Sequence, residues 1–171
     1  MTMSEVEHVL LSELLQWYGL QRHDFLNHWQ VIMGNLQLQQ LEKALAYMKE
    51  TVVAQEQEQK IAHLQEPALA AILLGLIIGL RQEGISATLD FPETMKKELF
   101  WRDHWQDDYA DGLYGYTKEC LKVCSQSRLL LNVTAEVYLF DEPSGLACQV
   151  ILEDEETVLF DKMLTLTIGA Q

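Results

Sequence analysis

The fold of the first third of this chain is decided by one run, Gln21-Arg22-His23-Asp24-Phe25-Leu26-Asn27-His28-Trp29-Gln30-Val31-Ile32-Met33-Gly34-Asn35-Leu36-Gln37-Leu38. Its apolar residues recur at steps of three and four, and the same spacing continues upstream. The apolar positions of this pattern are Leu11, Leu14, Leu15, Tyr18, Phe25, Leu26, Trp29, Ile32, Met33 and Leu36. The pattern predicts one long amphipathic helix from Ser4 to about Gln37.

A second helix follows after a short turn. The apolar phase changes around residues 38–41, and a new pattern formed by Leu45, Met48, Val52 and Val53 continues toward Lys60. Two helices joined so closely form an antiparallel hairpin. A single hairpin would leave these wide apolar stripes exposed, so we expect two chains to pair as a homodimer with a four-helix bundle.

A third, buried helix is predicted from Pro67 to about Gly84. Proline fits the first helical turn, where its missing N–H costs nothing. The apolar run Ala68–Leu80 has 13 residues, which is too short for a membrane span of roughly 20 residues. It is better explained as a helix inside a protein core, and we expect no membrane association.

The remaining sequence predicts a small sheet domain. Strand-like runs and one further helical pattern are separated by turn-forming residues. The predicted strands are Ile85–Phe91, Leu129–Phe140, Leu146–Glu153 and Thr157–Ile168, the helix is Leu113–Gln126, the hairpin loops are Asp141–Gly145 and Asp154–Glu156, and Thr94–Asp111 is expected to be a helix and loop covering the sheet. The expected fold class is α+β, with a dimerising helical hairpin in residues 1–64 and an α/β sandwich with an antiparallel meander in residues 65–171.

Composition excludes several classes of function. The formal net charge of −14 and a pI near 4.6 argue against binding nucleic acid or anionic membranes, because both need excess Lys and Arg. No basic patch precedes an apolar stretch at the N-terminus, so no secretory signal is expected. Cys120, Cys124 and Cys148 do not have the spacing of a disulfide framework or a zinc site. They are expected to be core thiols in the cytoplasm, and no metal site is predicted.

The polar flank of the first helix carries a candidate nucleophile. His23 and Asn27 are four residues apart and therefore share one line on the helix, which Gln30 extends. A neutral imidazole offers a nucleophilic nitrogen without a strong base. Phosphoryl transfer depends mainly on positioning and charge stabilisation, so one exposed imidazole is sufficient as an acceptor.

Neighbouring residues suggest roles around His23. Asp24 could hold the proton of the second ring nitrogen, and Asn27 could donate a hydrogen bond to a phosphoryl oxygen. Arg22 could offset phosphate charge or simply solvate the helix, and His28 and Gln30 are candidates for a partner-binding surface. A His-Asp pair on a helix is by itself more typical of a solvated polar face than of a site.

A longer resemblance strengthens the functional interpretation. Residues 21–38, together with 42–48 and 67–75, resemble the phosphoacceptor helix and following segments of the sporulation initiation phosphotransferase B family and of the related citrate- and dicarboxylate-sensing histidine kinases. The resemblance covers roughly the first 90 residues. It implies a phosphohistidine at His23, a dimeric four-helix bundle, response-regulator partners and a second domain similar to the ATPase domain of histidine kinases.

The second half of the sequence favours a phosphotransferase over a kinase. Kinases of this type hold magnesium and triphosphate with asparagines on the helix ahead of the sheet and with Asp-x-Gly-x-Gly boxes. Residues 113–120 contain no asparagine, and no Asp-x-Gly or Gly-x-Gly occurs in the chain. ATP therefore has no evident cradle, and this half resembles a degenerate ATPase domain.

The expected function is that of a phosphotransferase that moves phosphate between response-regulator aspartates in sporulation initiation. No intrinsic cofactor is expected, because Mg²⁺ would be held by the partner regulator. The alternatives are an ATP-dependent histidine kinase and a docking module without chemistry.

Overall fold

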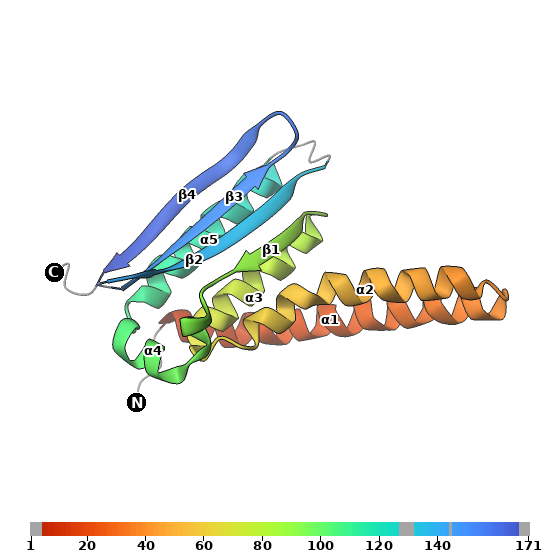
Figure 1. The fold of residues 1–171 in the computed structure, drawn as a ribbon, viewed down its shortest axis with the longest axis horizontal. Helices are drawn as coiled ribbons and strands as arrows, with labels where there is room; N and C mark the ends of the chain where they lie inside the picture. Colours follow the sequence, from red (N-terminus) through yellow and green to blue (C-terminus); the bar gives the residue numbers. More distant parts are fainter. Residues whose placement is uncertain (1–4, 127–131, 144, 168–171) are drawn as a thin grey trace.

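The computed structural model describes residues 5–126, 132–143 and 145–167 of the 171-residue chain. Two long helices, α1 (Glu5–Gln37) and α2 (Leu41–Ile61), form an antiparallel hairpin that projects from the rest of the molecule (Figure 1). The backbone reverses at Gln39, whose φ of 58° is left-handed. The predicted hairpin is confirmed, and only the proposed first residue, Ser4, lies outside the described residues.

The third helix, α3 (Pro67–Gln82), is buried as predicted. Proline occupies its first turn, and the Glu66 side chain caps it by accepting a hydrogen bond from the Ala68 amide at 3.1 Å. Gly84, with φ 77°, turns the chain out of the helix toward the first strand. Among the described residues, no helix is both long and apolar enough to cross a membrane.

A four-stranded sheet completes the fold. Its strands β1 (Ser86–Asp90), β2 (Thr134–Glu142), β3 (Gly145–Glu153) and β4 (Val158–Thr167) are ordered β1-β2-β3-β4. Strands β2 to β4 form the predicted antiparallel meander, and β1 adds to β2 in parallel. Helix α5 (Tyr109–Gln126) covers one face of the sheet (Figure 1). The α+β class is therefore confirmed.

Several predicted boundaries differ from the structure. Helix α5 begins at Tyr109 instead of Leu113. The first described strand residue after α5 is Thr134, whereas residues 127–131 of the predicted strand are not described. The loop between β2 and β3 is shorter than predicted because Gly145 already pairs in β3. A Cβ at Gly145 would overlap the Leu166 backbone carbonyl, so only glycine permits this close approach.

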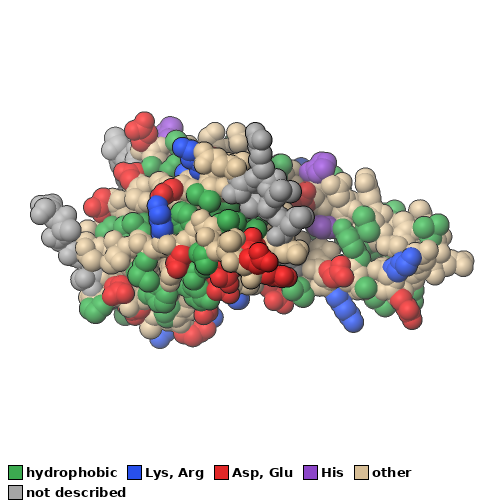
Figure 2. Space-filling model, turned by 90° about the horizontal axis from the view of Figure 1, so that it is seen from above, with side chains coloured by type: hydrophobic (Ala, Val, Ile, Leu, Met, Phe, Trp, Pro, Cys, Tyr) green, Lys and Arg blue, Asp and Glu red, His purple; other side chains and the backbone are tan. Residues whose placement is uncertain are grey.

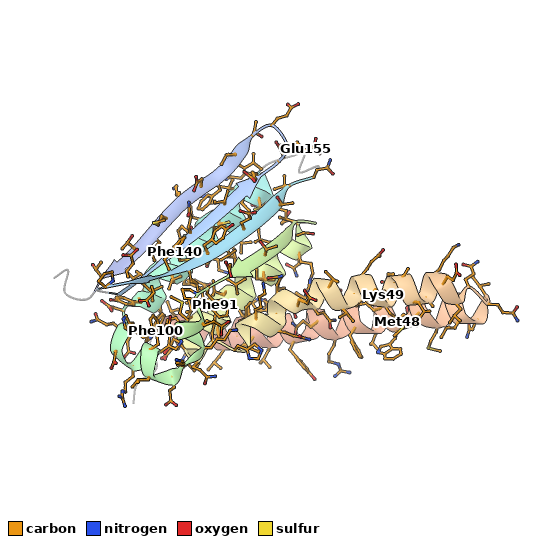
Figure 3. All side chains as sticks on the ribbon, in the orientation of Figure 1. Met48, Lys49, Phe91, Phe100, Phe140 and Glu155 are labelled. Atoms are coloured by element: carbon orange, nitrogen blue, oxygen red, sulfur yellow. The ribbon has the colours of Figure 1, made fainter. Side chains whose placement is uncertain are left out.

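The segment before α5 forms a short 3₁₀ helix, η1 (Glu93–Lys96), and helix α4 (Glu98–His104). It lies at one end of the sheet instead of covering a face, and Figure 3 shows Phe100 in this position, at the opposite end of the domain from Glu155 in the β3–β4 turn. The Trp101 indole donates to the Met95 carbonyl at 2.6 Å. Contacts between aromatic rings hold this segment together. Such contacts do not produce a helical periodicity in the sequence.

The first half of α1 belongs to the same core as the sheet. Leu10 is buried in this core, and the Trp17 ring lies directly against Gly75 of α3. On the neighbouring turn, Glu13 accepts hydrogen bonds from the Tyr114 hydroxyl at 2.9 Å and from the Lys118 ammonium at 2.7 Å, both on α5. Helix α1 is thus fixed to α3 and α5 before it extends into the hairpin.

Candidate functional site

His23 lies on the part of α1 that leaves the sheet and enters the hairpin. Its side chain is 74% exposed. The ring directs Nδ1 toward its own helix, where the Asn27 amide nitrogen is 3.1 Å away and the Asp24 Oδ1 is 3.8 Å away. Within the described part of the chain, Nε2 has no hydrogen-bonding partner. An incoming protein can therefore reach Nε2 directly.

The neighbours of Nδ1 control which ring nitrogen carries the proton. When the Asn27 amide nitrogen donates to Nδ1, the proton of a neutral imidazole resides on Nε2, which then cannot attack. Rotation of the amide presents its oxygen to Nδ1 instead. The proton then moves to Nδ1, where the negative Asp24 carboxylate 3.8 Å away also favours it, and the free electron pair lies on Nε2.

A chain of polar contacts connects Asp24 to the other helices. Its second oxygen, Oδ2, is 3.9 Å from a guanidinium nitrogen of Arg81, which comes from the last turn of α3. A second guanidinium nitrogen of Arg81 is ion-paired with Glu58 of α2. Gln21 of α1 donates to the second Glu58 oxygen at 2.8 Å. Three helices thus meet beside His23.

Sequence reasoning did not identify Arg81, Glu58 or Gln21 as part of this site. One signal was available for the first of them, because Arg81 is the only charged residue in α3. A single cation at the end of an otherwise apolar helix has to reach solvent or a partner. No local pattern indicates which partner it finds.

The predicted partner-binding residues fall into two groups. Arg22 and Gln30 are exposed on α1, and the Arg22 guanidinium lies 5.9 Å from the centre of the Tyr18 ring. His28 instead points into the hairpin, where its Nδ1 is 2.7 Å from the Tyr47 hydroxyl of α2. This position gives His28 a contact within the chain, and its place on a partner surface stays a prediction.

A groove of about 520 Å³, lined by polar and aromatic side chains, lies between α1 and α2 at this level and is bordered by Arg81 of α3. Its lining consists of Tyr18, Gln21, Arg22, Asp24, Phe25, Asn27, His28, Tyr47, Thr51, Gln55, Glu58 and Arg81. Further along the hairpin, Ile32 and Ala44 are buried instead. The two helices are therefore joined by polar contacts next to His23 and by apolar contacts toward the tip.

The hairpin also exposes an unusual amount of apolar surface. The rings of Phe25 and Trp29 pack edge to face at 5.9 Å, yet both side chains are about half exposed. The other exposed large apolar residues of the hairpin are Val9, Leu11, Leu14, Leu15, Tyr18, Leu20, Leu26, Val31, Met33, Leu36, Leu38, Leu41, Leu45, Met48, Val52 and Val53. In the view of Figure 2, some hydrophobic side chains are visible among polar ones on the projecting helices.

Comparisons with known proteins agree with the resemblance seen in the sequence. Residues 1–64 match the family described as sensor kinase SpoOB-type, alpha-helical domain. Over 61 residues the chain is 38% identical to sporulation initiation phosphotransferase B of Bacillus subtilis (strain 168). The aligned stretch covers 36% of this chain and 32% of that relative. The match thus spans about a third of the relative's length. The predicted family resemblance is confirmed for the helical hairpin that carries His23.

Proposed function

We propose that this chain is a phosphorelay phosphotransferase whose phosphoryl group is carried by His23. The observation that carries the proposal is the exposed imidazole with an unpartnered Nε2, on a helix that matches the SpoOB-type domain. The similarity to a sporulation phosphotransferase supports a role in sporulation initiation. The reaction would take place in the cytoplasm, where response regulators act.

The proposed reaction is a reversible exchange between two proteins. His23 Nε2 attacks the phosphorus of an aspartyl phosphate on a response regulator, and a P–N bond forms. The P–O bond to the aspartate breaks, and the carboxylate leaves with the electron pair. The phosphohistidine then passes the same group to an aspartate of another regulator. High reactivity of both phosphorylated species allows transfer in either direction.

Asp24 and Asn27 prepare His23 for this exchange. With the Asn27 amide rotated so that its oxygen accepts the Nδ1 proton, and with the Asp24 carboxylate 3.8 Å away favouring a proton there, Nε2 is the free nucleophile. The same contacts stabilise the imidazolium charge that develops as the P–N bond forms. Asn27 therefore acts at Nδ1 in this proposal, instead of donating to a phosphoryl oxygen as its sequence position suggested.

The metal for this reaction is supplied by the regulator in our proposal. The described residues contain no group of three or more His, Cys, Asp or Glu side chains that could hold a metal ion. A response regulator that brings its own acidic pocket and Mg²⁺ would shield the charge of the transferring group. Arg22 and Gln30 are exposed near His23 and are the proposed contacts for that partner.

The proposed active form is a homodimer. The apolar stripe around Phe25 and Trp29 has the extent of a surface that a second copy would cover. Pairing of two hairpins would bury these stripes and leave both His23 rings accessible. Light scattering should give about twice the chain mass of 19.7 kDa. A mass of one chain at micromolar concentration would refute the dimer.

The proposal is tested with a response regulator charged with radiolabelled acetyl phosphate. Label should pass to the wild-type chain and to His63→Gln, an exposed control histidine, but not to His23→Gln. Labelling of His23→Gln would refute the assignment. Labelling by ATP and Mg²⁺ alone would favour a kinase, and regulator binding without any transfer would favour a docking module.

A further inference from the structure

We infer that Arg81 is a positioning residue of the phosphoacceptor site, contributed by the helix that leads into the sheet. The inference rests on the proposed function of His23. Its basis is the guanidinium that lies between Glu58 on one side and Asp24 Oδ2 on the other. Among the described residues, Arg81 is ion-paired with Asp24 and Glu58 and has no such contact with His23, so it acts through Asp24.

The two oxygens of Asp24 have separate neighbours. Oδ2 faces Arg81 at 3.9 Å, and Oδ1 faces His23 Nδ1 at 3.8 Å. An attraction at Oδ2 restricts rotation of the carboxylate and keeps Oδ1 directed at the imidazole. Without Arg81, a carboxylate that is about half exposed would turn toward water. The carboxylate would then give less electrostatic support to a proton on His23 Nδ1.

Arg81 is itself held in place from two directions. Glu58 binds its guanidinium from α2, and Gln21 holds the second Glu58 oxygen from α1. Helix α3 is in turn fixed to α1 by the contact of Trp17 with Gly75. The position of Arg81 relative to His23 is therefore set by packing between α1 and α3, not by a flexible loop.

This arrangement gives the part of the chain beyond the hairpin a role in the reaction. A nucleotide-binding domain that has to deliver phosphate must move relative to the histidine. Here α1 is clamped to α3 and α5 through Trp17 and Glu13, close to the site itself. A domain that does not move relative to α1 can keep Arg81 beside Asp24 at all times.

The inference is first tested by the rate of phosphoryl transfer within the complex with a phosphorylated regulator. Arg81→Gln should lower this rate about two- to fivefold, the range for a half-exposed ion pair, and leave the Kd of the regulator unchanged. Arg81→Lys should restore part of the rate. Arg102→Gln removes another surface arginine, paired with Asp103 at 3.9 Å, and should have no effect.

A double-mutant cycle separates positioning from simple support of the fold. In the Asp24→Asn background, Arg81→Gln should cause no further loss of rate, because both act through one contact. Equal losses in the two backgrounds would overturn the inference, and so would a wild-type rate for Arg81→Gln.

A third measurement needs no phosphate. The ¹⁵N chemical shifts of the His23 ring report which nitrogen carries the proton, and Arg81→Gln should reduce the fraction protonated at Nδ1. An unchanged or increased fraction would overturn the inference. If this fraction falls as expected but His23 never accepts phosphate, the proposed function fails while the positioning role of Arg81 stands.

Discussion

Replacing Trp29 with alanine should sharply weaken self-association of the chain. Its side chain is 47% exposed in the single chain. A tryptophan side chain presents up to about 250 Å², so roughly 120 Å² remains for a partner to cover. At about 25 cal/mol per Å², this area is worth about 3 kcal/mol per subunit and about 6 kcal/mol for a symmetric pair.

The measured effect should be smaller than this area suggests, because neighbouring side chains rearrange and truncation energies do not simply add. We expect the dimer Kd to rise by about two to four orders of magnitude. Sedimentation equilibrium over a range of concentrations measures this constant, and circular dichroism at the same concentrations verifies that the helices persist.

Met163→Ala is the matched control, since Met163 is similarly exposed but lies on β4, away from the hairpin. Its dimer Kd should equal that of the wild type. An unchanged Kd for Trp29→Ala would show that this stripe is not the interface. Equal weakening by both variants would point to a general loss of stability instead.

Three further changes test the fold. Gly75→Ala places a Cβ into the Trp17 ring and should lower the free energy of unfolding in urea by about 1–3 kcal/mol. Gly34→Ala is the control, because Gly34 has open space around it, and this change should leave the free energy of unfolding unchanged or raise it by up to about 1 kcal/mol. Tyr116→Phe removes a hydroxyl that accepts from a β3 amide at 2.7 Å and donates to a β4 carbonyl at 2.6 Å, so unfolding should become about 1–3 kcal/mol easier and hydrogen exchange of that amide faster. Backbone N–H groups of the β3–β4 turn donate to Asp154 and hold its pKa below the ordinary 3.8. The stability that Asp154 contributes to the turn is therefore complete above pH 3.8 and is lost as the pH falls through the lower pKa of the folded state. Hydrogen exchange of the turn amides should accordingly become faster in acid, and in Asp154→Asn this dependence on pH should be absent.

The helices could be predicted from sequence because their physical causes are local. The apolar spacing around Phe25 and Trp29 fixes the face of α1, and Pro67 marks the first turn of α3. The parallel addition of β1 to β2 could not be predicted, because a long stretch of chain separates the two strands. The segment of Trp101 was also misplaced, since aromatic packing and not periodicity determines its course.

The candidate site was predictable only where its residues are neighbours in sequence. His23, Asp24 and Asn27 lie within two turns of one helix, and the structure brings them together. Arg81 and Glu58 come from other helices, and their meeting depends on how α1, α2 and α3 pack. Helical spacing determines the face of a residue, but it does not determine which residue of another helix approaches it.

Phosphoryl transfer to His23 is tested most directly by locating the phosphate on the protein itself. After exchange with a charged response regulator, ³¹P NMR and peptide mapping at neutral pH should find one acid-labile phosphohistidine, at Nε2 of His23. Phosphate on any other residue, or no phosphate on the chain while the regulators still exchange it, would contradict the account.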